Sequence, residues 1–195
     1  RLDHVLQAIA AADAAGLHPI KINAVVMPGV NEEDIVPLAD YAVHHGAQLR
    51  VIEQMPLGPR EKWRREDMVT AADILARLRT HFSMEPAREP RGSAPAALWE
   101  VSAPDGTRGK LGIIASVTHP FCGDCDRTRL TTDGAIRNCL FGNSETPLRD
   151  LLRSGASDED IMEAWAGEMW TKKPGHGIDD EGFLQPDRPM SAIGG

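Results

Sequence analysis

Residues 20–26 read Ile-Lys-Ile-Asn-Ala-Val-Val, and residues 48–55 read Gln-Leu-Arg-Val-Ile-Glu-Gln-Met. In the first stretch, apolar side chains alternate with Lys21 and Asn23, which is the period of a β-strand. Between the two stretches lies an amphipathic helical pattern that Asn31 can cap. A strand, a helix and a second strand in this order predict parallel pairing, with the helix packed outside the sheet.

The pattern changes on either side of this unit. Residues 2–15 have the apolar spacing of a helix. After residue 56 the chain passes through a loop into short elements joined by turns, and residues 171–195 show no periodicity. The expected elements are a helix with a Thr70–Asp73 capping box, strands over 98–103 and 109–117, strands over 127–131 and 135–141, a helix begun by Thr146-Pro147 and a helix begun by Ser157.

The expected fold class is therefore α/β for residues 1–55 and α+β afterwards. Two parallel strands cannot close a sheet, so the first segment has the character of the last units of a larger α/β layer. The first residue is Arg1 rather than Met, which favours a piece of a longer protein. An exposed strand edge beside residues 20–26 is expected to favour aggregation.

Charge and composition exclude some partners. The net charge is −8 and the aromatic content is 5%, so nothing would steer the chain to a phosphate backbone or stack single-stranded bases. No apolar run of 18 residues and no signal-peptide pattern are present. We expect a cytoplasmic protein with no nucleic-acid partner and no membrane span.

All three cysteines of the chain lie between Cys122 and Cys139. An odd, clustered count argues against a disulfide framework and favours metal binding or redox chemistry. A three-residue loop, Thr132-Asp133-Gly134, would place Gly134 in the left-handed region and make paired positions sum to 266. Cys139 would then lie across from Arg127, two residues beyond Cys125, with Arg127 and Arg129 on its face. A two-residue Asp-Gly turn would instead send Cys139 to the opposite face, and the longer loop is preferred because it gathers the charges and thiolates together.

Three thiolates can satisfy three irons of a [4Fe–4S] cluster and leave the fourth iron for a nitrogen or oxygen ligand. Arg127 and Arg129 beside it are suited to phosphate or another anion. Other interpretations stay open. The thiols could be free and buried, a Cys3His zinc site could use His119 or His176, and the arginines could form a solvated strand face.

A family resemblance rests on several motifs. Phe121-Cys-Gly-Asp-Cys-Asp-Arg-Thr-Arg-Leu, followed by Asp133-Gly134 and Cys139-Leu-Phe, resembles the C-terminal cluster motif of the radical-SAM GTP 3′,8-cyclases of molybdenum cofactor biosynthesis. Lys21-Ile-Asn, Arg50-Val-Ile-Glu-Gln-Met55 and the terminal Gly194-Gly195 resemble the same family. The resemblance runs from the first helix to the last residue.

The resemblance implies roles for these residues. Cys122, Cys125 and Cys139 would hold a [4Fe–4S] cluster whose open iron binds the guanine of GTP. Arg127, Thr128, Arg129 and Lys21 look like GTP contacts, and Met55 resembles a backbone contact to S-adenosylmethionine, with Arg50 near the same site. The Gly194-Gly195 tail would reach into the active site, where it is counted with Arg127 and Arg129 as catalytic. Simpler interpretations stay open for each residue. Lys21 could be solvated, Met55 could pack in the core, and Gly194-Gly195 could be a frayed terminus. His176 and the acidic run 179–181 could face solvent.

The resemblance also implies an architecture and a reaction. Residues 1–60 would be the end of an incomplete (βα)6 radical-SAM barrel, and residues 61–195 a [4Fe–4S]- and GTP-binding domain with antiparallel strands. The family is a lyase that uses S-adenosylmethionine radical chemistry to convert GTP to (8S)-3′,8-cyclo-7,8-dihydroguanosine 5′-triphosphate. Cyclic pyranopterin monophosphate synthase would be the pathway partner, and a homodimer stays open.

The chain departs from the family in one respect. The Cys-x3-Cys-x2-Cys motif of the cluster that cleaves S-adenosylmethionine is absent from this sequence. We therefore expect the chain to be a C-terminal part of such an enzyme and to be inactive alone. The [4Fe–4S] cluster that cleaves S-adenosylmethionine is expected only in the intact enzyme. A non-catalytic zinc module and a radical-SAM maturase acting on a different substrate are the alternative function classes.

Overall fold

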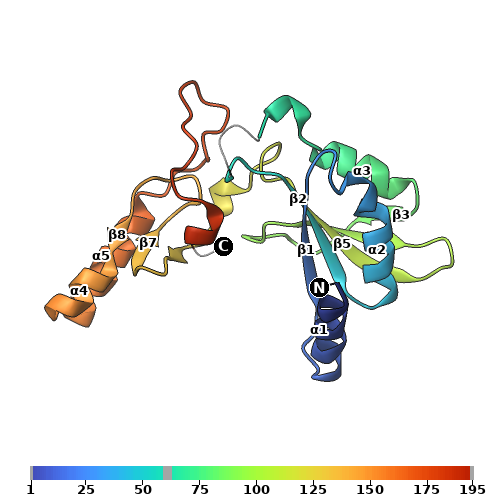
Figure 1. Ribbon diagram of the computed structural model, residues 1–195, viewed down its shortest axis with the longest axis horizontal. Coiled ribbons are helices and arrows are strands. Elements are labelled where there is room, and N and C mark those ends of the chain that lie inside the picture. The colour runs from blue at the N-terminus through green and yellow to red at the C-terminus, as the bar shows by residue number, and fades with distance from the viewer. Residues whose placement is uncertain (1, 59–62, 194–195) are drawn as a thin grey trace. The chain divides into compact units, whose positions relative to one another are not determined.

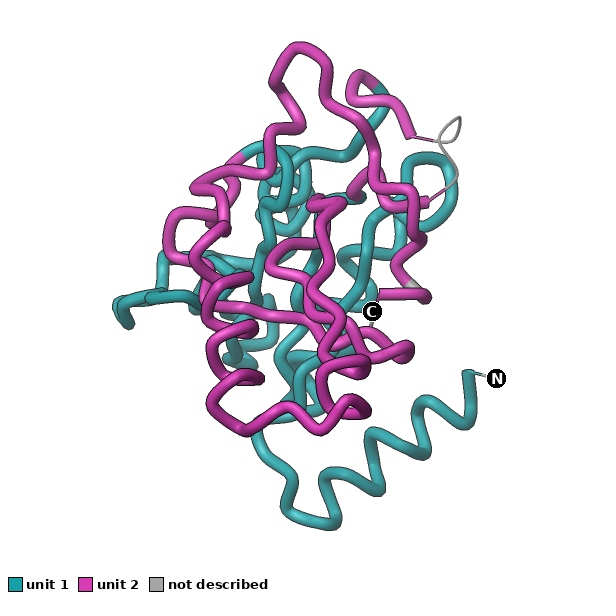
Figure 2. Tube along the Cα trace, turned by 90° about the vertical axis from the view of Figure 1, so that its left-hand side faces the viewer, with its two compact units in different colours: residues 1–54, 67–118 teal, residues 55–66, 119–195 magenta. Residues whose placement is uncertain are grey.

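The structure is a computed structural model that describes residues 2–58 and 63–193 (Figure 1). It divides into two compact units, which Figure 2 distinguishes by colour. Unit 1 comprises residues 1–54 and 67–118, and unit 2 comprises residues 55–66 and 119–195. Residues 67–118 therefore pack with the N-terminal segment, so these units do not follow the expected boundary at residue 60. The functional domains expected from the sequence stay a prediction.

Unit 1 is built on a mixed sheet with the strand order β1-β2-β5-β4-β3. The parallel pairing of β1 and β2 is confirmed, with Lys21 opposite Gln48 and Asn23 opposite Arg50. β5 adds to β2 in parallel, while β4 and β3 continue the sheet antiparallel. The strands are β1 (Lys21–Val26), β2 (Gln48–Glu53), β3 (Ser83–Pro86), β4 (Ala97–Ser102) and β5 (Arg108–Ile114).

The hairpin of β4 and β5 was expected from its turn, and Gly106 does take a positive φ of 90° there. Its place in the α/β sheet was not expected. The hairpin joins the sheet because Leu111 and Ile113 of β5 are buried in the same core as Leu49 of β2. Burying these side chains together removes apolar surface from water, which stabilises the pairing of the two strands.

Helices α2 (Ile35–His44) and α3 (Ala71–Arg79) contribute to that core, and Figure 1 shows both on the same side of the sheet. The Thr70–Asp73 capping box of α3 is confirmed. The expected cap at Asn31 is wrong. Its side chain instead closes the turn after β1, accepting the Met27 amide at 2.8 Å and donating to the Val25 carbonyl at 3.0 Å, and a 3₁₀ turn, Glu32–Asp34, precedes α2.

Helix α1 (Leu2–Ala14) is confirmed, and its described residues are exposed or half-buried. None of the described helices is long and apolar enough to cross a membrane.

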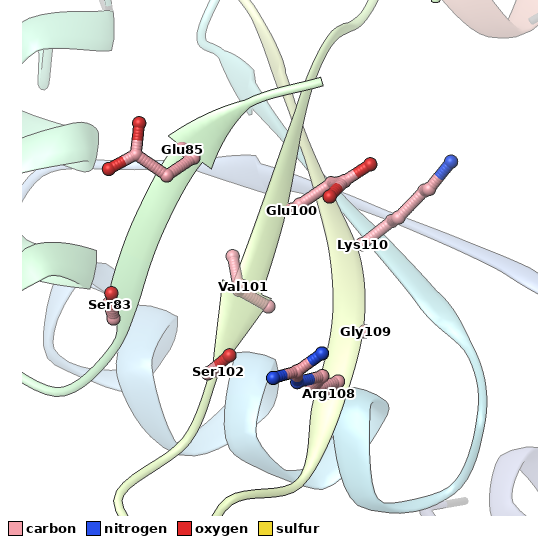
Figure 3. Close-up of a pocket in the computed structure, with 8 residues that line it drawn as sticks. All are labelled: Ser83, Glu85, Glu100, Val101, Ser102, Arg108, Gly109 and Lys110. Atoms are coloured by element: carbon pink, nitrogen blue, oxygen red, sulfur yellow. The ribbon is translucent and has the colours of Figure 1, made fainter. Parts of the chain in front are cut away.

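The face of the sheet away from α2 and α3, called the polar face below, carries charged and polar side chains alongside apolar ones such as Val25. Lys21 and Asn23 are exposed on it, as their alternation with apolar residues predicts. Glu100 and Lys110 sit opposite each other on β4 and β5 and project side by side from neighbouring strands (Figure 3). They line an open depression of about 420 Å³ together with Ser83, Glu85, Val101, Ser102, Arg108 and Gly109.

Unit 2 contains a second sheet in the order β6-β7-β8, with antiparallel pairing throughout. The expected helix start at Thr146-Pro147 is wrong, since these two residues form β8 and pair with β7. Thr146 Oγ1 donates to Glu168 Oε2 at 2.8 Å instead of capping a helix. The capping box at Ser157 and Asp160 is confirmed. The elements are β6 (Arg129–Leu130), β7 (Ala135–Arg137), β8 (Thr146–Pro147), α4 (Leu148–Ser154) and α5 (Asp158–Trp170).

Candidate metal and anion site

The cysteine hairpin has the register that its loop predicts. Arg129 pairs with Arg137 and Leu130 with Ile136, so paired positions sum to 266 as expected. The Thr131 amide donates to the Ala135 carbonyl at 2.8 Å, and the Gly134 amide donates back to the Thr131 carbonyl at 3.0 Å. Gly134 has a φ of 83°, in the left-handed region that glycine tolerates best.

The three thiols lie within electrostatic reach of one another. Cys122 begins a 3₁₀ turn, Cys122–Asp124, and Cys125 follows it. The Cys125 amide donates a hydrogen bond to the Cys122 carbonyl at 3.2 Å. All three side chains are half-buried. Burial raises the pKa of the Cys122 thiol, and the charges of Cys139 and Cys125 raise it further. A metal centre that takes three thiolates would relieve this mutual repulsion.

The thiols are not drawn together as a finished ligand set. Among the described residues, no group of three or more His, Cys, Asp and Glu side chains is arranged to hold a metal ion. The donor set nevertheless fits a soft metal centre by its chemistry, because it consists of three half-buried thiols that interact electrostatically.

Arg127 contacts both the cysteine turn and an aromatic ring. Its guanidinium lies 4.5 Å from the centroid of the Phe121 ring, and its Nη2 donates to Cys125 Sγ at 3.3 Å. Burial by itself raises the pKa of the Cys125 thiol, but hydrogen bonds from Arg127 and its positive charge bring that pKa below its usual value. Arg127 therefore favours the thiolate form of Cys125.

Arg129 is a second cation of the same face. Burial lowers the pKa of its guanidinium, and the neighbouring charges of Arg127 and Arg137 lower it further, while Cys139 and Cys125 act in the opposite direction. Between the two arginines, the Thr128 hydroxyl is buried and has no hydrogen-bond partner among the described residues. The neighbouring guanidiniums of Arg127 and Arg129 are suited to an oxyanion.

Arg137 is a buried cation that sequence reasoning missed. Its side chain is 2% exposed. Nη1 pairs with Glu145 at 2.5 Å and Nη2 donates to the Gly142 carbonyl. Glu145 also binds Arg188 Nη1 at 2.9 Å, which ties the stretch before the chain end to the hairpin. The sequence did carry one indication of its place: Arg137 is two residues before Cys139, so strand alternation puts both side chains on the same face.

Two more residues at the base of the hairpin were missed. Lys172 donates from Nζ to the carbonyl oxygens of Arg127, at 2.7 Å, and Asn138. The Asn138 amide group in turn donates to Thr171 Oγ1 at 2.8 Å. Lys172 follows α5 in an aperiodic stretch, where no local pattern marks it.

The two candidate histidine ligands differ in their surroundings. His119 is exposed. His176 is half-buried rather than solvent-facing, because its ring packs on Phe141 at a centroid distance of 5.3 Å and its Nδ1 accepts the Ile178 amide at 3.1 Å. Its backbone amide also hydrogen-bonds the Cys122 thiol. The run 179–181 is exposed, as expected.

The remaining predicted residues lie on other elements. Lys21 and Arg50 share the polar face of unit 1, where Arg50 Nε donates to Gln48 Oε1 at 3.0 Å. Met55 follows the end of β2 and is half-buried, and its carbonyl accepts the Leu57 amide at 2.8 Å. Gly194 and Gly195 lie outside the described residues. The roles of these residues stay predictions.

Comparison with known proteins identifies the family. Residues 47–178, which include all three cysteines and both arginines, match the family described as Molybdenum Cofactor Synthesis C. The chain belongs to this family.

Individual relatives agree with this assignment. The chain is 74% identical over its whole length to a GTP 3′,8-cyclase of Corynebacterium glutamicum and covers 52% of that protein. It is 58% identical to GTP 3′,8-cyclase 2 of Mycobacterium tuberculosis, of which it covers 54%. The match is to the C-terminal half of these proteins, so the chain spans about half the length of the curated relatives it matches.

Proposed function

We propose that this chain supplies the metal- and nucleotide-binding half of a GTP 3′,8-cyclase. In this proposal Cys122, Cys125 and Cys139 hold a [4Fe–4S] cluster, while Arg127, Thr128 and Arg129 receive GTP. The observation that carries it is the meeting of thiols and guanidiniums on one hairpin. Arg127 hydrogen-bonds Cys125, and Arg129 interacts electrostatically with Cys125 and Cys139.

A cluster held by three thiolates would leave one iron for a nitrogen or oxygen of the substrate. The protein residues have separate tasks. Arg127 stabilises the thiolate of Cys125, and its guanidinium lies over the ring of Phe121. Arg129, crowded by Arg127 and Arg137, gains most from a phosphate that neutralises the group.

Binding of this kind would promote the reaction by holding the substrate in one position. A substrate held at its phosphates by arginines and at its base by a metal has little freedom left. Fixing reacting groups in near-attack geometry contributes about 7–11 kcal/mol in favourable cases. The hairpin residues thus orient GTP, and the radical chemistry belongs to the complete protein.

The rest of the proposal concerns the complete protein. Unit 1 carries the parallel pair β1 and β2, which we assign to the end of a (βα)6 radical-SAM barrel. Lys21 would contact GTP, and Arg50 and Met55 would contact S-adenosylmethionine. All three cysteines of this chain are already assigned, so a second, S-adenosylmethionine-cleaving cluster requires ligands from outside it. We expect no release of 5′-deoxyadenosine by this chain alone with reductant.

The test is anaerobic reconstitution with iron and sulfide, followed by their quantification. The proposal expects a brown protein with about four irons and four sulfides per chain, and a loss of both in C122S, C125S and C139S. A colourless protein with one zinc per chain would instead support a Cys3His site. Iron content unchanged in all three serine variants would overturn the cysteine assignment.

A further inference from the structure

The end of α5 is fastened to the base of the cysteine hairpin. Asn138, the residue before Cys139, donates from Nδ2 to the Glu168 carbonyl at 3.1 Å and to Thr171 Oγ1 at 2.8 Å. Thr171 Oγ1 donates to the same Glu168 carbonyl at 2.8 Å. This arrangement sets the direction in which the chain leaves α5, toward Lys172.

Lys172 bridges the two limbs of the hairpin where the strand ladder stops. The last ladder pair on this side is Arg129 with Arg137. Beyond it, Lys172 Nζ donates to the carbonyl oxygens of Arg127, at 2.7 Å, and Asn138. The Lys172 ammonium therefore links the two limbs close to the cysteines, because Arg127 is two residues after Cys125 and Asn138 directly precedes Cys139.

We propose that Lys172 is a positioning residue of the cysteine site, which fixes the separation of the limbs bearing Cys125 and Cys139 and supplies a positive charge beside the bound metal centre. This rests on the proposed function, because it presumes that the cysteines bind a cluster. Three points carry it: the two carbonyl contacts, the half-buried position of the side chain, and its electrostatic reach to Cys122 and Cys125.

The charge has a consequence that packing alone does not have. Reduction of a cluster adds an electron to a site that already holds three thiolates. A nearby ammonium favours the reduced form by Coulombic attraction, which is strong in a partly buried site. Removing that charge should shift the reduction potential to more negative values, whereas an unaltered charge in a slightly different position should not.

The chain offers a matched control. Lys173 is the next residue, has the same charge, and is exposed. The set K172M, K172Q, K172R and K173M therefore separates loss of the charge from loss of a lysine in this stretch. All four variants are compared with the unaltered 195-residue chain after identical anaerobic reconstitution.

The expected results are specific. In K172M, a competing chelator should remove the iron at an about tenfold lower chelator concentration, because loss of residues that support metal ligands weakens metal affinity by about 10–100-fold. Its midpoint potential should be more negative, and its electron paramagnetic resonance spectrum should broaden. K172R should restore both iron retention and potential, and K173M should match the unaltered chain.

The outcomes separate this inference from the proposed function. Absence of iron from the unaltered chain overturns the proposed function and this inference with it. An iron-loaded unaltered chain, with K172M equal to it in iron retention and potential, overturns the inference alone. Should K172M fail to fold by circular dichroism, K172Q against K172R decides: equal potentials in that pair contradict the role of the charge.

Discussion

Glu53 Oε2 accepts the backbone amide of Val117 at 2.8 Å, although the two residues are 64 positions apart in the chain. The same oxygen accepts the Thr118 amide at 2.9 Å, and Oε1 accepts the Ala71 amide at 2.7 Å. Glu53 is fully buried. One carboxylate therefore joins the end of β2 to the start of α3 and to the segment that follows β5.

These contacts predict a large loss of stability in E53Q. The glutamine side chain keeps one acceptor oxygen, but its NH2 group faces backbone donors and cannot accept from them. Hydrogen bonds to a charged group contribute about 1.5–3 kcal/mol each, and we expect E53Q to lower the free energy of unfolding by about that amount. Urea denaturation followed by circular dichroism measures it.

The control for Glu53 is E85Q, which removes a carboxylate from the exposed face of β3. Surface substitutions of this kind usually stay within about 0.5 kcal/mol. If E53Q and E85Q unfold at the same urea concentration, the Glu53 contacts do not contribute to stability as the geometry implies.

Gly134 supports a second prediction, because two obstacles to a side chain coincide there. Its φ is 83°, and an added Cβ would lie 2.6 Å from Arg149 Cβ. Left-handed backbone costs a non-glycine residue about 1–2 kcal/mol, and overpacking adds about 1–3 kcal/mol. We expect G134A to unfold well before the unaltered chain in urea and to hold less iron after reconstitution.

Gly155 isolates the backbone contribution. It has a φ of 81°, but an added Cβ would meet no described atom within 4 Å. G155A should therefore lose about 1–2 kcal/mol, clearly less than G134A. Equal losses in the two variants would show that the contact with Arg149 relaxes at no cost.

The Gly134 hairpin also shows what could be predicted from sequence. Local chemistry allowed two turns at Asp133-Gly134, and the three-residue loop was preferred because it gathers the cysteine and arginine side chains on one face, which the observed register bears out. The capping boxes of α3 and α5 are local in the same sense. The same register places Cys125 and Cys139 on the two limbs that continue the hairpin strands, while the cysteines' role as metal ligands stays a prediction.

Features that depend on distant segments were not predictable in this way. The place of β5 beside β2 depends on apolar faces that meet only after folding, more than 50 residues apart in the chain. Thr146 carries the signature of a helix cap but bonds the distant Glu168 instead. Asn31 failed as a cap for a local reason, because its side chain closes the turn just before it. Lys172 had no periodic context, so its part in the site became apparent only from its carbonyl contacts.

The pair of His44 and Asp105 predicts a dependence of stability on pH. His44 Nε2 lies 2.9 Å from Asp105 Oδ2, which joins α2 to the turn between β4 and β5. The hydrogen bond to Asp105, followed by the Asp40 carbonyl, raises the pKa of His44. The same bond, with further ones from Thr107, lowers the pKa of Asp105 to about 2.

The sign follows from each shift. A raised pKa in the folded state means that the contribution of His44 is complete below its ordinary pKa of 6.5 and disappears as pH rises through the folded value. The contribution of Asp105 is complete above its ordinary pKa of 3.8 and disappears as pH falls toward 2. The pair therefore stabilises the fold most between about pH 4 and 6.5.

The measurement compares urea midpoints of the unaltered chain and H44Q from pH 3 to pH 8.5. The difference between them should be largest near pH 5 and shrink on both sides. H18Q is the control, since the His18 imidazole is 57% exposed and 3.7 Å from Asp13. A difference between H44Q and the unaltered chain that stays constant from pH 5 to 8.5 would contradict the assignment.

The last prediction concerns the two arginines of the hairpin and the anion we assign to them. R129A should weaken GTP binding by at least about tenfold, because a charge-assisted hydrogen bond contributes about 1.5–3 kcal/mol. R127A should act similarly, but it also removes the hydrogen bond to Cys125, so R129A is the cleaner variant. Calorimetry on the reconstituted chain measures the affinity, with iron content determined on the same samples.

The design separates phosphate contacts from base contacts. Guanosine lacks the triphosphate, so its binding should be the same in R129A and the unaltered chain, while GTP binding falls. R153A removes an exposed arginine from α4 and makes the same change in net charge. It should leave GTP affinity unchanged, because salt screens the effect of an exposed, distant charge. If R129A and R127A both bind GTP as the unaltered chain does, the crowding of Arg127, Arg129 and Arg137 has another purpose, because a site built for phosphate cannot lose a guanidinium without cost.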